Sequence, residues 1–145
     1  MASAEATEVF NCTQEQFYSI ITDFESYSKF LSEVEDCRVV EDLGGNEKIV
    51  EYHVKVVKPF AYRLLMKFDE PHSLTWTFDS GDLFKVSNGS WHLQDVDGKT
   101  KATYRVEASF KMFVPGPIAK ALVSVNLPNM MASYHKRVAS LFNKV

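Results

Sequence analysis

The sequence contains little cysteine, and what it has does not form a metal-binding or disulfide pattern. Its two cysteines, Cys12 and Cys37, lie far apart and belong to no CxxC motif. Small secreted domains often depend on several disulfides, whereas isolated thiols are typical of reducing compartments. We therefore expect two free thiols, and a single bridge between them is the alternative that the sequence leaves open.

Excess positive charge and long apolar runs are also absent. The formal net charge is −3 at pH 7, so the chain has no overall positive field that would attract nucleic acid, DNA included, or an anionic membrane. No apolar stretch reaches the roughly 20 residues of a transmembrane helix, and the N-terminal stretch has neither signal-peptide nor transit-peptide character. These absences predict a cytoplasmic protein with no transmembrane segment. They leave open a local basic patch, and they do not determine the oligomeric state.

Motifs for metal, phosphate or dinucleotide binding are missing as well. The sequence has no Gly-rich phosphate loop and no nucleophile elbow, and its four histidines show no metal-ligand spacing. We therefore predict no cofactor and no metal ion. The 145 residues are 46% hydrophobic and contain no repeat or linker, so we expect residues 1–145 to form a single domain.

A long amphipathic helix is predicted over residues 117–145. Apolar residues recur at helical spacing both before and after Pro128. Pro117 suits the first helical position, with Gly116 as its cap. Pro128 would remove a backbone hydrogen bond and clash with the preceding turn. We therefore expect the helix to kink or break at Pro128.

The N-terminal part is predicted to contain a strand over residues 4–10 and then two short helices. Thr13 and Gln16 have the spacing of a capping box, and apolar residues follow at intervals of three and four as far as Phe24. Asp23 is placed to cap a second short helix that runs to Leu31. The two helices therefore follow each other with almost no linker.

From about residue 36 to residue 112, apolar and polar residues alternate, which is typical of antiparallel strands buried on one face. The predicted strands cover approximately residues 36–43, 50–56, 60–68, 74–78, 84–93 and 102–112. Turns are expected at residues 44–46, at Pro59, after Pro71, and at residues 80–82 and 97–98. Together with the first strand, this predicts a sheet of about seven strands.

The inward parity changes within the sixth strand, between Val86 and Trp91. Asn88 and Gly89 lie at that point and fit either a tight hairpin or a bulge. A hairpin would leave two strands shorter than their neighbours, so we predict a bulge at Asn88-Gly89.

A sheet that is apolar on one face needs a cover, and the C-terminal helix is the only predicted element long enough to provide it. The expected fold class is therefore α+β, with a curved antiparallel sheet wrapped on a long C-terminal helix.

The order of the predicted elements, together with residues 23–31 and 89–93, resembles the START-like (SRPBCC) superfamily, whose helix-grip fold occurs in polyketide cyclases, lipid-transfer domains and birch-pollen-type allergens. Residues 23–31, DFESYSKFL, are similar to the D-x-E-x-Y-x-x-F-L stretch of the branch with coenzyme-Q-binding proteins and ribosome-association toxins, and residues 89–93, GSWHL, to its G-x-W-x-F strand. In residues 32–37 the sequence SEVEDC stands where that branch usually has a Pro-Trp-Cys-like segment. The resemblance covers nearly the whole chain and implies a cavity between the sheet and the C-terminal helix.

The inward residues of the predicted strands form an apolar and aromatic wall. Periodicity alone favours a filled core, whereas the resemblance favours a pocket in which tyrosine hydroxyls and tryptophan N–H groups orient a hydrophobic ligand. The candidate pocket residues are Val50, Tyr52, Val54, Tyr62, Leu64, Met66, Trp76, Phe78, Phe84, Trp91, Tyr104 and Val106 from the sheet, and Leu122, Val125 and Met130 from the helix.

The sequence favours non-catalytic binding or transport of a hydrophobic small molecule, such as a lipid, quinone, isoprenoid or polyketide-like compound. One alternative is an interaction module like the ribosome-association toxins, with a ribosome or protein partner. Lys136, Arg137 and Lys144 would supply its basic groups. A polyketide cyclase or dehydrase is least favoured, because Glu51 and Glu107 have outward parity and leave the predicted pocket without a general base.

Overall fold

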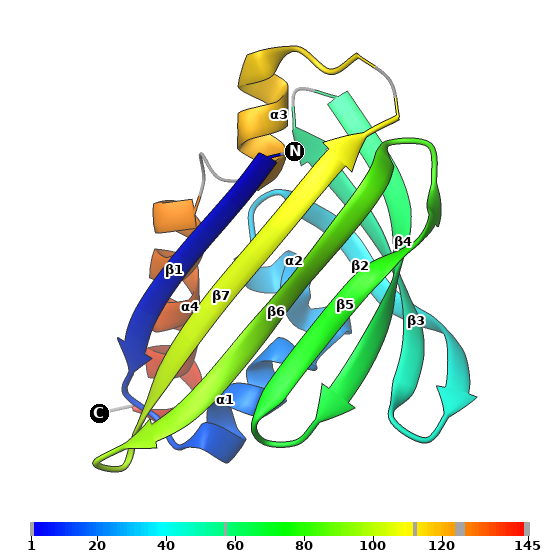
Figure 1. The fold of residues 1–145 in the computed structure, drawn as a ribbon. Helices are drawn as coiled ribbons and strands as arrows, with labels where there is room; N and C mark the ends of the chain where they lie inside the picture. The colour runs from blue at the N-terminus through cyan, green and yellow to red at the C-terminus, as the bar shows by residue number, and fades with distance from the viewer. Residues whose placement is uncertain (1, 57, 112, 124–126, 144–145) are drawn as a thin grey trace.

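The computed structural model describes residues 2–56, 58–111, 113–123 and 127–143. Seven antiparallel strands form one curved sheet, and the helices lie against its concave face (Figure 1). The strands are β1 (Ala2–Phe10), β2 (Val34–Gly44), β3 (Glu47–Val56), β4 (Lys58–Asp69), β5 (Ser73–Gly81), β6 (Phe84–Val96) and β7 (Lys99–Phe110). The helices are α1 (Gln14–Ile21), the 3-10 turn η1 (Phe24–Ser26), α2 (Tyr27–Phe30), α3 (Gly116–Val123) and α4 (Leu127–Phe142).

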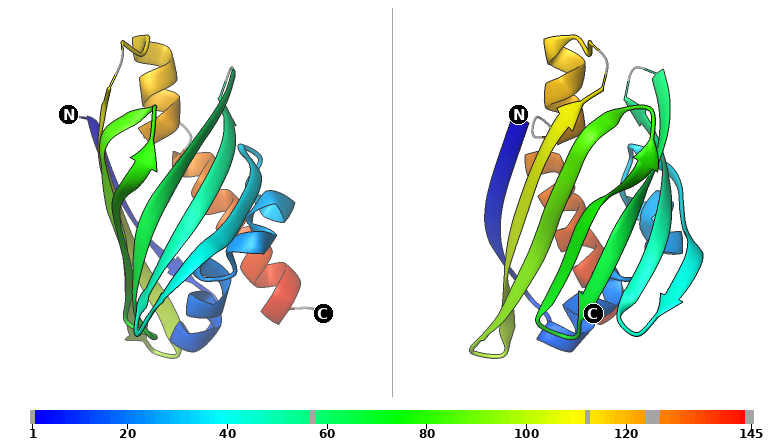
Figure 2. Two further views of the ribbon diagram at one scale, coloured as in Figure 1. Left: turned by 90° about the vertical axis from the view of Figure 1, so that its right-hand side faces the viewer. Right: turned by 45° about the vertical axis from the view of Figure 1, so that its right-hand side comes forward.

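The sheet order is β1-β7-β6-β5-β4-β3-β2, so each strand from β2 to β7 pairs with the next one along the chain. β1 pairs with β7, from Ala2 opposite Ala108 to Phe10 opposite Thr100. Figure 2 shows α1, α2 and α4 on one side of the sheet, with α3 across one end. The predicted fold is confirmed. No helix of the described residues is long and apolar enough to cross a membrane.

The capping box that begins α1 is confirmed. The Gln16 amide N–H donates to the Thr13 hydroxyl at 3.1 Å, and the Thr13 N–H donates to the Gln16 side-chain oxygen at 2.9 Å. The predicted cap at Asp23 is wrong, because its side chain makes no capping hydrogen bond. The Asp23 backbone carbonyl instead accepts from the Ser26 N–H at 3.1 Å, which closes the 3-10 turn directly.

The predicted turn at Asp97-Gly98 is confirmed, because both residues have positive φ, 53° and 82°, as a two-residue hairpin turn requires. The predicted break at Pro59 is wrong. Pro59 lies inside β4, paired with Lys55 of β3. β5 joins β4 only from Tyr62 onward, so Pro59 has a partner strand on one side only, where proline is tolerated.

β6 is continuous and contains a bulge rather than a hairpin, as predicted, but the bulge is not at Asn88-Gly89. The pairing with β7 shifts between Phe84 and Val86, near the start of the strand. Ser87 therefore takes the buried face that the sequence assigned to Val86, and Ser87 is buried while Val86 is half-buried.

The predicted C-terminal helix is covered by two helices, α3 and α4, and Pro128 lies in the first turn of the second. α3 ends at Val123 and α4 begins at Leu127, with residues 124–126 outside the described part of the chain. Pro128 is the second residue of α4, where the helix has no partner for a backbone N–H. α3 also begins one residue earlier than predicted, at Gly116, and the Pro115 carbonyl accepts from the N–H groups of Ile118 and Ala119, each at 3.0 Å.

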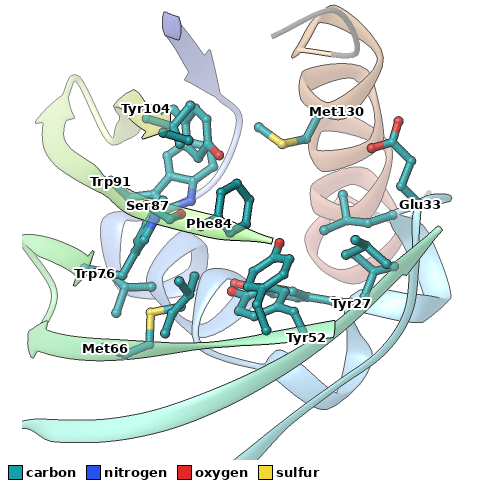
Figure 3. Close-up of a pocket in the computed structure, with 18 of the residues that line it drawn as sticks. Tyr27, Glu33, Tyr52, Met66, Trp76, Phe84, Ser87, Trp91, Tyr104 and Met130 are labelled. Atoms are coloured by element: carbon teal, nitrogen blue, oxygen red, sulfur yellow. The ribbon is translucent and has the colours of Figure 1, made fainter. Parts of the chain in front are cut away.

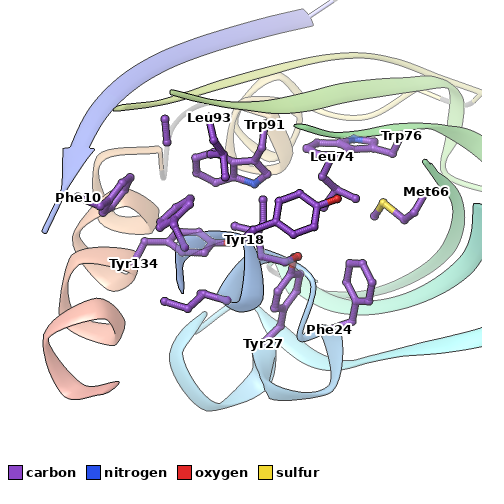
Figure 4. Close-up of a cluster of buried hydrophobic side chains, with 14 of the residues drawn as sticks. Phe10, Tyr18, Phe24, Tyr27, Met66, Leu74, Trp76, Trp91, Leu93 and Tyr134 are labelled. Atoms are coloured by element: carbon purple, nitrogen blue, oxygen red, sulfur yellow. The ribbon is translucent and has the colours of Figure 1, made fainter. Parts of the chain in front are cut away.

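The main hydrophobic core lies where α1 and α4 meet the sheet (Figure 4). Phe17 is fully buried and stacks on Phe10 at a centroid distance of 4.4 Å. Its other neighbours include Trp91 at 5.4 Å and Tyr134 at 5.9 Å. These aromatic rings fill the α1 side of the interior, so any open space must lie farther along the sheet, toward α3.

Candidate ligand-binding pocket

A pocket of about 160 Å³ lies between the sheet, the turn at residues 31–33 and α4 (Figure 3). β3 to β7 supply most of its wall, and α2 and α4 supply the cover. The sequence-predicted residues that line it are Tyr52, Val54, Tyr62, Leu64, Met66, Trp76, Phe84, Trp91, Tyr104, Val106 and Met130. The structure therefore brings most of the predicted wall together around one space, and its role in ligand binding stays a prediction.

Of the other four predicted residues, two lie outside this wall and two have side chains outside the described part of the structure. Val50 is fully buried in the main core, at a level of β3 where side chains already fill the interior. Phe78 packs against the small cluster of Leu83, Phe84 and Ala108. The side chain of Leu122 and the whole of Val125 lie outside the described residues.

Sequence reasoning missed several lining residues: Tyr27, Leu31, Glu33, Val34, Leu74, Ser87, Ala108 and Tyr134. Strand alternation already placed Leu74 and Ala108 inward, and Tyr134 lies one helical turn after Met130, so periodicity contained a signal for these three. The inward orientation of Ser87 was not predicted, because the bulge was predicted at the wrong position in β6. Residues of the turn at 31–33 follow no period, so their orientation had no signal in the sequence.

Contacts between aromatic rings hold the pocket wall in place. The Tyr52 and Tyr62 rings stack at 5.4 Å with an interplanar angle of 10°. The Tyr104 ring lies 5.9 Å from Trp76 and 4.9 Å from Trp91. Rings that support one another keep their orientation without a ligand, so the pocket presents preformed flat surfaces.

Gly89 gives Trp76 its place in the wall. The two residues are partners across β5 and β6, and a Cβ atom at Gly89 would overlap the Trp76 indole. The indole therefore packs directly against the β6 backbone. Any side chain at this position would push the ring into the pocket or away from the strand.

Five tyrosines line the pocket and all remain neutral at physiological pH. Burial raises the pKa of Tyr104 to about 12, and it also raises the pKa of each of the other four, which are Tyr27, Tyr52, Tyr62 and Tyr134. The Tyr27 hydroxyl donates to the Ile21 carbonyl. Neutral phenols both donate and accept hydrogen bonds, so this wall is suited to orienting oxygen atoms of a ligand.

Glu33 is a carboxylate at the edge of the pocket, on the same side as Met130 (Figure 3). Its backbone carbonyl accepts from the Lys55 N–H at 2.8 Å, which fixes the turn to β3. Burial raises the pKa of Glu33, and among the described residues its carboxylate forms no ion pair. The expectation that the pocket has no acid or base is therefore wrong at this residue.

Glu51 has the outward orientation that the sequence predicted. Its carboxylate lies 3.0 Å from His53 Nε2, 3.0 Å from Arg63 Nε and 3.3 Å from Arg38 Nη2. The hydrogen bonds with His53 and Arg63 lower the pKa of Glu51 to about 2. Glu51 therefore belongs to a charged network on the outer face of the sheet. Among the described residues, no group of His, Cys, Asp and Glu is arranged to hold a metal ion.

The structure is similar to several solved structures of low sequence identity. A START superfamily protein from Mycobacterium smegmatis has a TM-score of 0.82 and 19% identity, over 96% of this chain and 98% of its own. The Zhui aromatase/cyclase from Streptomyces sp. R1128 has a TM-score of 0.78 and 14% identity, over 94% of this chain and 93% of its own. Human STARD10 has a TM-score of 0.79 and 15% identity, over 96% of this chain and 64% of its own. At these identities the likeness shows the fold alone.

At the level of sequence, no curated protein matches this chain significantly. The family described as polyketide cyclase / dehydrase and lipid transport does match it, over residues 11–133. The match includes both helices after β1, β2 to β7, α3 and the first part of α4. Together with the helix-grip fold, it shows that the chain belongs to this family of the START-like superfamily.

Proposed function

We propose that this protein binds a hydrophobic small molecule in the pocket and carries it without covalent chemistry. The observation that carries the proposal is the wall of preformed aromatic rings with neutral hydroxyl groups. Apolar rings with a few polar groups are the usual composition of a small-molecule site. The family description, which includes lipid transport, supports the same proposal.

The size of the pocket narrows the ligand class within this proposal. A dry cavity of about 150 Å³ is enough for benzene, and the pocket measures about 160 Å³. It therefore suits one ring, or the ring-bearing end of a longer molecule. Flat rings and hydroxyls favour a quinone or an oxygenated aromatic over a plain alkyl chain, which offers nothing for the tyrosines to bind.

Both tryptophans of the chain line the pocket, so intrinsic fluorescence reports directly on its occupancy. Titration with a one-ring quinone, 2,6-dimethylbenzoquinone, is expected to quench the fluorescence in a saturable manner, whereas n-hexane, which offers no oxygen atom to the tyrosines, is expected to have little effect. Trp76→Ala is expected to weaken quinone binding. Native mass spectrometry and organic extraction of freshly purified protein would identify a retained ligand. Absence of both saturable quenching and any retained or bindable hydrophobic compound would contradict the proposal.

Glu33 favours a second candidate function, a cyclase or dehydrase, because it supplies the pocket carboxylate that such chemistry needs. In this role Glu33 would accept a proton from a carbon next to a carbonyl, while a tyrosine hydroxyl donates a hydrogen bond to that carbonyl oxygen. The family description includes polyketide cyclase and dehydrase. Glu33→Gln separates the two functions, because a carrier keeps its ligand affinity and an enzyme loses turnover of a polyketide-type substrate.

A ribosome or protein partner remains the third alternative, with fewer free basic groups than the sequence indicated. The Arg137 guanidinium lies 5.2 Å from the centre of the Phe30 ring, so it takes part in packing between α4 and α2. Lys136 is exposed, and Lys144 lies outside the described residues. Co-sedimentation with ribosomal subunits across a salt series tests this alternative.

A cytoplasmic location completes the proposal. It is supported by Cys12 and Cys37, which are both buried and unbridged, as expected for a reducing compartment. Fractionation of expressing cells, with the protein detected by antibody, tests the location.

A further inference from the structure

An exposed phenylalanine marks one end of the molecule. Phe113, in the connection between β7 and α3, is 89% exposed, the highest value for a large apolar side chain among the described residues. The next residue, Val114, packs against the cluster of Leu83, Phe84 and Ala108. The chain is therefore anchored beside Phe113, while the Phe113 ring itself faces water.

An apolar path joins this end to the ligand pocket. Phe84 and Ala108 line the pocket and also belong to the cluster on which Val114 packs. Phe110 stacks on Phe84 at 5.4 Å and extends the same cluster toward the end of β7. The exposed ring at position 113 thus lies at the outer limit of apolar surface that begins inside the pocket.

Several lysines lie at the same end of the sheet as Phe113. The exposed lysines there are Lys55 and Lys58 at the β3–β4 connection, Lys85 at the start of β6, Lys111 after β7 and Lys120 on α3. None of them forms an ion pair among the described residues. Lys111 Nζ donates to the Gly81 carbonyl at 3.0 Å, which holds its charge beside the β5–β6 turn. Asp79 and Asp82 are the carboxylates near that turn.

The opposite end of the sheet carries more acidic than basic side chains. Its hairpin turns carry Glu41 and Asp42 at β2–β3, Asp69 and Glu70 at β4–β5, and Asp95 and Asp97 at β6–β7. Figure 1 shows that these three turns lie together at the end away from α3. The far end also holds Lys48, Lys67, Lys99 and Lys101, so its excess of negative charge is moderate. At the end with Phe113 the five lysines outnumber the carboxylates Glu33, Asp79 and Asp82.

We propose that the end formed by Phe113, Lys58, Lys85, Lys111 and Lys120, the docking end, binds the surface of a lipid bilayer that contains anionic lipids. Peripheral binding combines insertion of an apolar side chain with attraction between lysines and anionic headgroups, and the docking end supplies both. The acidic far end is repelled by the same surface, so the molecule is oriented with its pocket toward the bilayer. A hydrophobic ligand then moves between bilayer and pocket along apolar surface.

The exposed phenylalanine favours a bilayer over a nucleic acid as the partner. Binding of a nucleic acid duplex needs only the lysines, and a single strand would stack its bases on the ring, but neither gives a role to the apolar surface that continues from the ring into the pocket. A bilayer takes up the ring as well as pairing with the charges. The cytoplasmic leaflet, which carries the anionic lipids of a cell membrane, agrees with the location proposed above.

Vesicle co-sedimentation of the full chain tests the docking end. Wild-type protein is expected to bind vesicles of phosphatidylcholine with roughly 30% phosphatidylglycerol, and to bind pure phosphatidylcholine vesicles much more weakly. Phe113→Ser is expected to weaken binding roughly tenfold. The double variant K58E/K111E is expected to remove the preference for anionic vesicles. Thermal melting of each variant shows that it is folded.

Matched controls come from the acidic end. Leu43 is 49% exposed in β2 next to the β2–β3 turn, so Leu43→Ser removes an exposed apolar side chain without touching the docking end. Lys99→Glu reverses an exposed charge at the β6–β7 turn. Both variants are expected to bind like wild type. The proposal is overturned if anionic vesicles bind no protein at low salt, or if the controls weaken binding as much as the docking-end variants. The proposal is also overturned if Phe113→Ser leaves vesicle binding unchanged while the wild-type protein binds single-stranded RNA.

Discussion

Gly89 faces Trp76 across the ladder between β5 and β6, and the position of a large pocket ring depends on this one missing side chain. The sequence indicated the G-x-W stretch only as a family likeness. Its physical reason appears in the structure, where the indole occupies the space of the absent Cβ. Neither periodicity nor composition contains this contact, because it depends on which residues face each other across two strands.

Gly89→Ala is therefore expected to lower the free energy of unfolding by about 1–3 kcal/mol, since the added methyl group forces the indole or the strand to move. Chemical denaturation measures this loss. Gly116→Ala is the control, because a Cβ there meets no atom within 4 Å and alanine favours a helix, so stability is expected to stay level or rise by up to about 1 kcal/mol. In a Trp76→Leu background the cost of Gly89→Ala is expected to shrink; an unchanged cost would show that the indole is not its cause.

The Cys12 thiol is expected to make the protein less stable at alkaline pH. Burial raises the pKa of its thiol from 9.0 to about 11, so between these values the unfolded chain has lost a proton that the folded protein still holds. The contribution of the Cys12 thiol to stability is therefore fully present below pH 9 and is lost as the pH rises toward 11. Between pH 8 and pH 10.5 we expect Cys12 to contribute a loss of about 1–2 kcal/mol. Denaturation curves at the two pH values should show a smaller loss for Cys12→Ala; an equal loss in both proteins would contradict the assignment.

The helices and strands were largely predictable, because each buries one face, and the apolar residues of that face recur with the spacing of a helix or a strand. The errors lie where the surrounding structure overrides a rule that holds for a short stretch of sequence. Pro59 resembles a strand terminator until the register shows that β4 has one neighbour there. The β6 bulge was expected from parity, which counts residues between two inward positions and does not locate the extra one between Phe84 and Trp91.

The position of Pro128 near the start of α4 gives a direct test. Pro128 is the second residue of α4, where its missing N–H costs no hydrogen bond, so Pro128→Ala is expected to change stability by less than about 1 kcal/mol. A proline kink inside one continuous helix would instead give stabilisation of about 3 kcal/mol on removal. The control is Ala132→Pro, at an exposed position within α4, which is expected to cost about 3 kcal/mol or more. Thermal or chemical denaturation distinguishes these outcomes.

At the scale of the whole molecule, periodicity predicted the sheet, its cover and most of the wall, whereas only the family resemblance implied the open space. A pocket is the small difference between the volume that the backbone encloses and the volume that side chains fill, and hydrophobic patterning is the same for a filled and an unfilled interior. Trp91 illustrates this, because it packs on Phe17 in the core and also lines the pocket. Only three-dimensional packing shows where the core ends and the pocket begins.

A protein that keeps an open pocket for a ligand gives up packing energy, so filling the pocket should raise stability and lower affinity together. Ser87 is buried and lines the pocket. Ser87→Val adds apolar volume there and is expected to raise the free energy of unfolding by about 1 kcal/mol. The same change is expected to weaken quinone quenching of tryptophan fluorescence at least several-fold, because less room is left for the ring.

Ser90→Val provides the matched control, since it is the same substitution on the same strand. Ser90 pairs with Thr75 and Arg105 and lies beside a hollow on the outer face of the sheet. Its replacement is expected to leave quinone binding unchanged. If the two variants behave alike in both denaturation and titration, the space beside Ser87 is a packing defect. If the pocket is kept open for a ligand, only Ser87→Val should raise stability and weaken quinone binding.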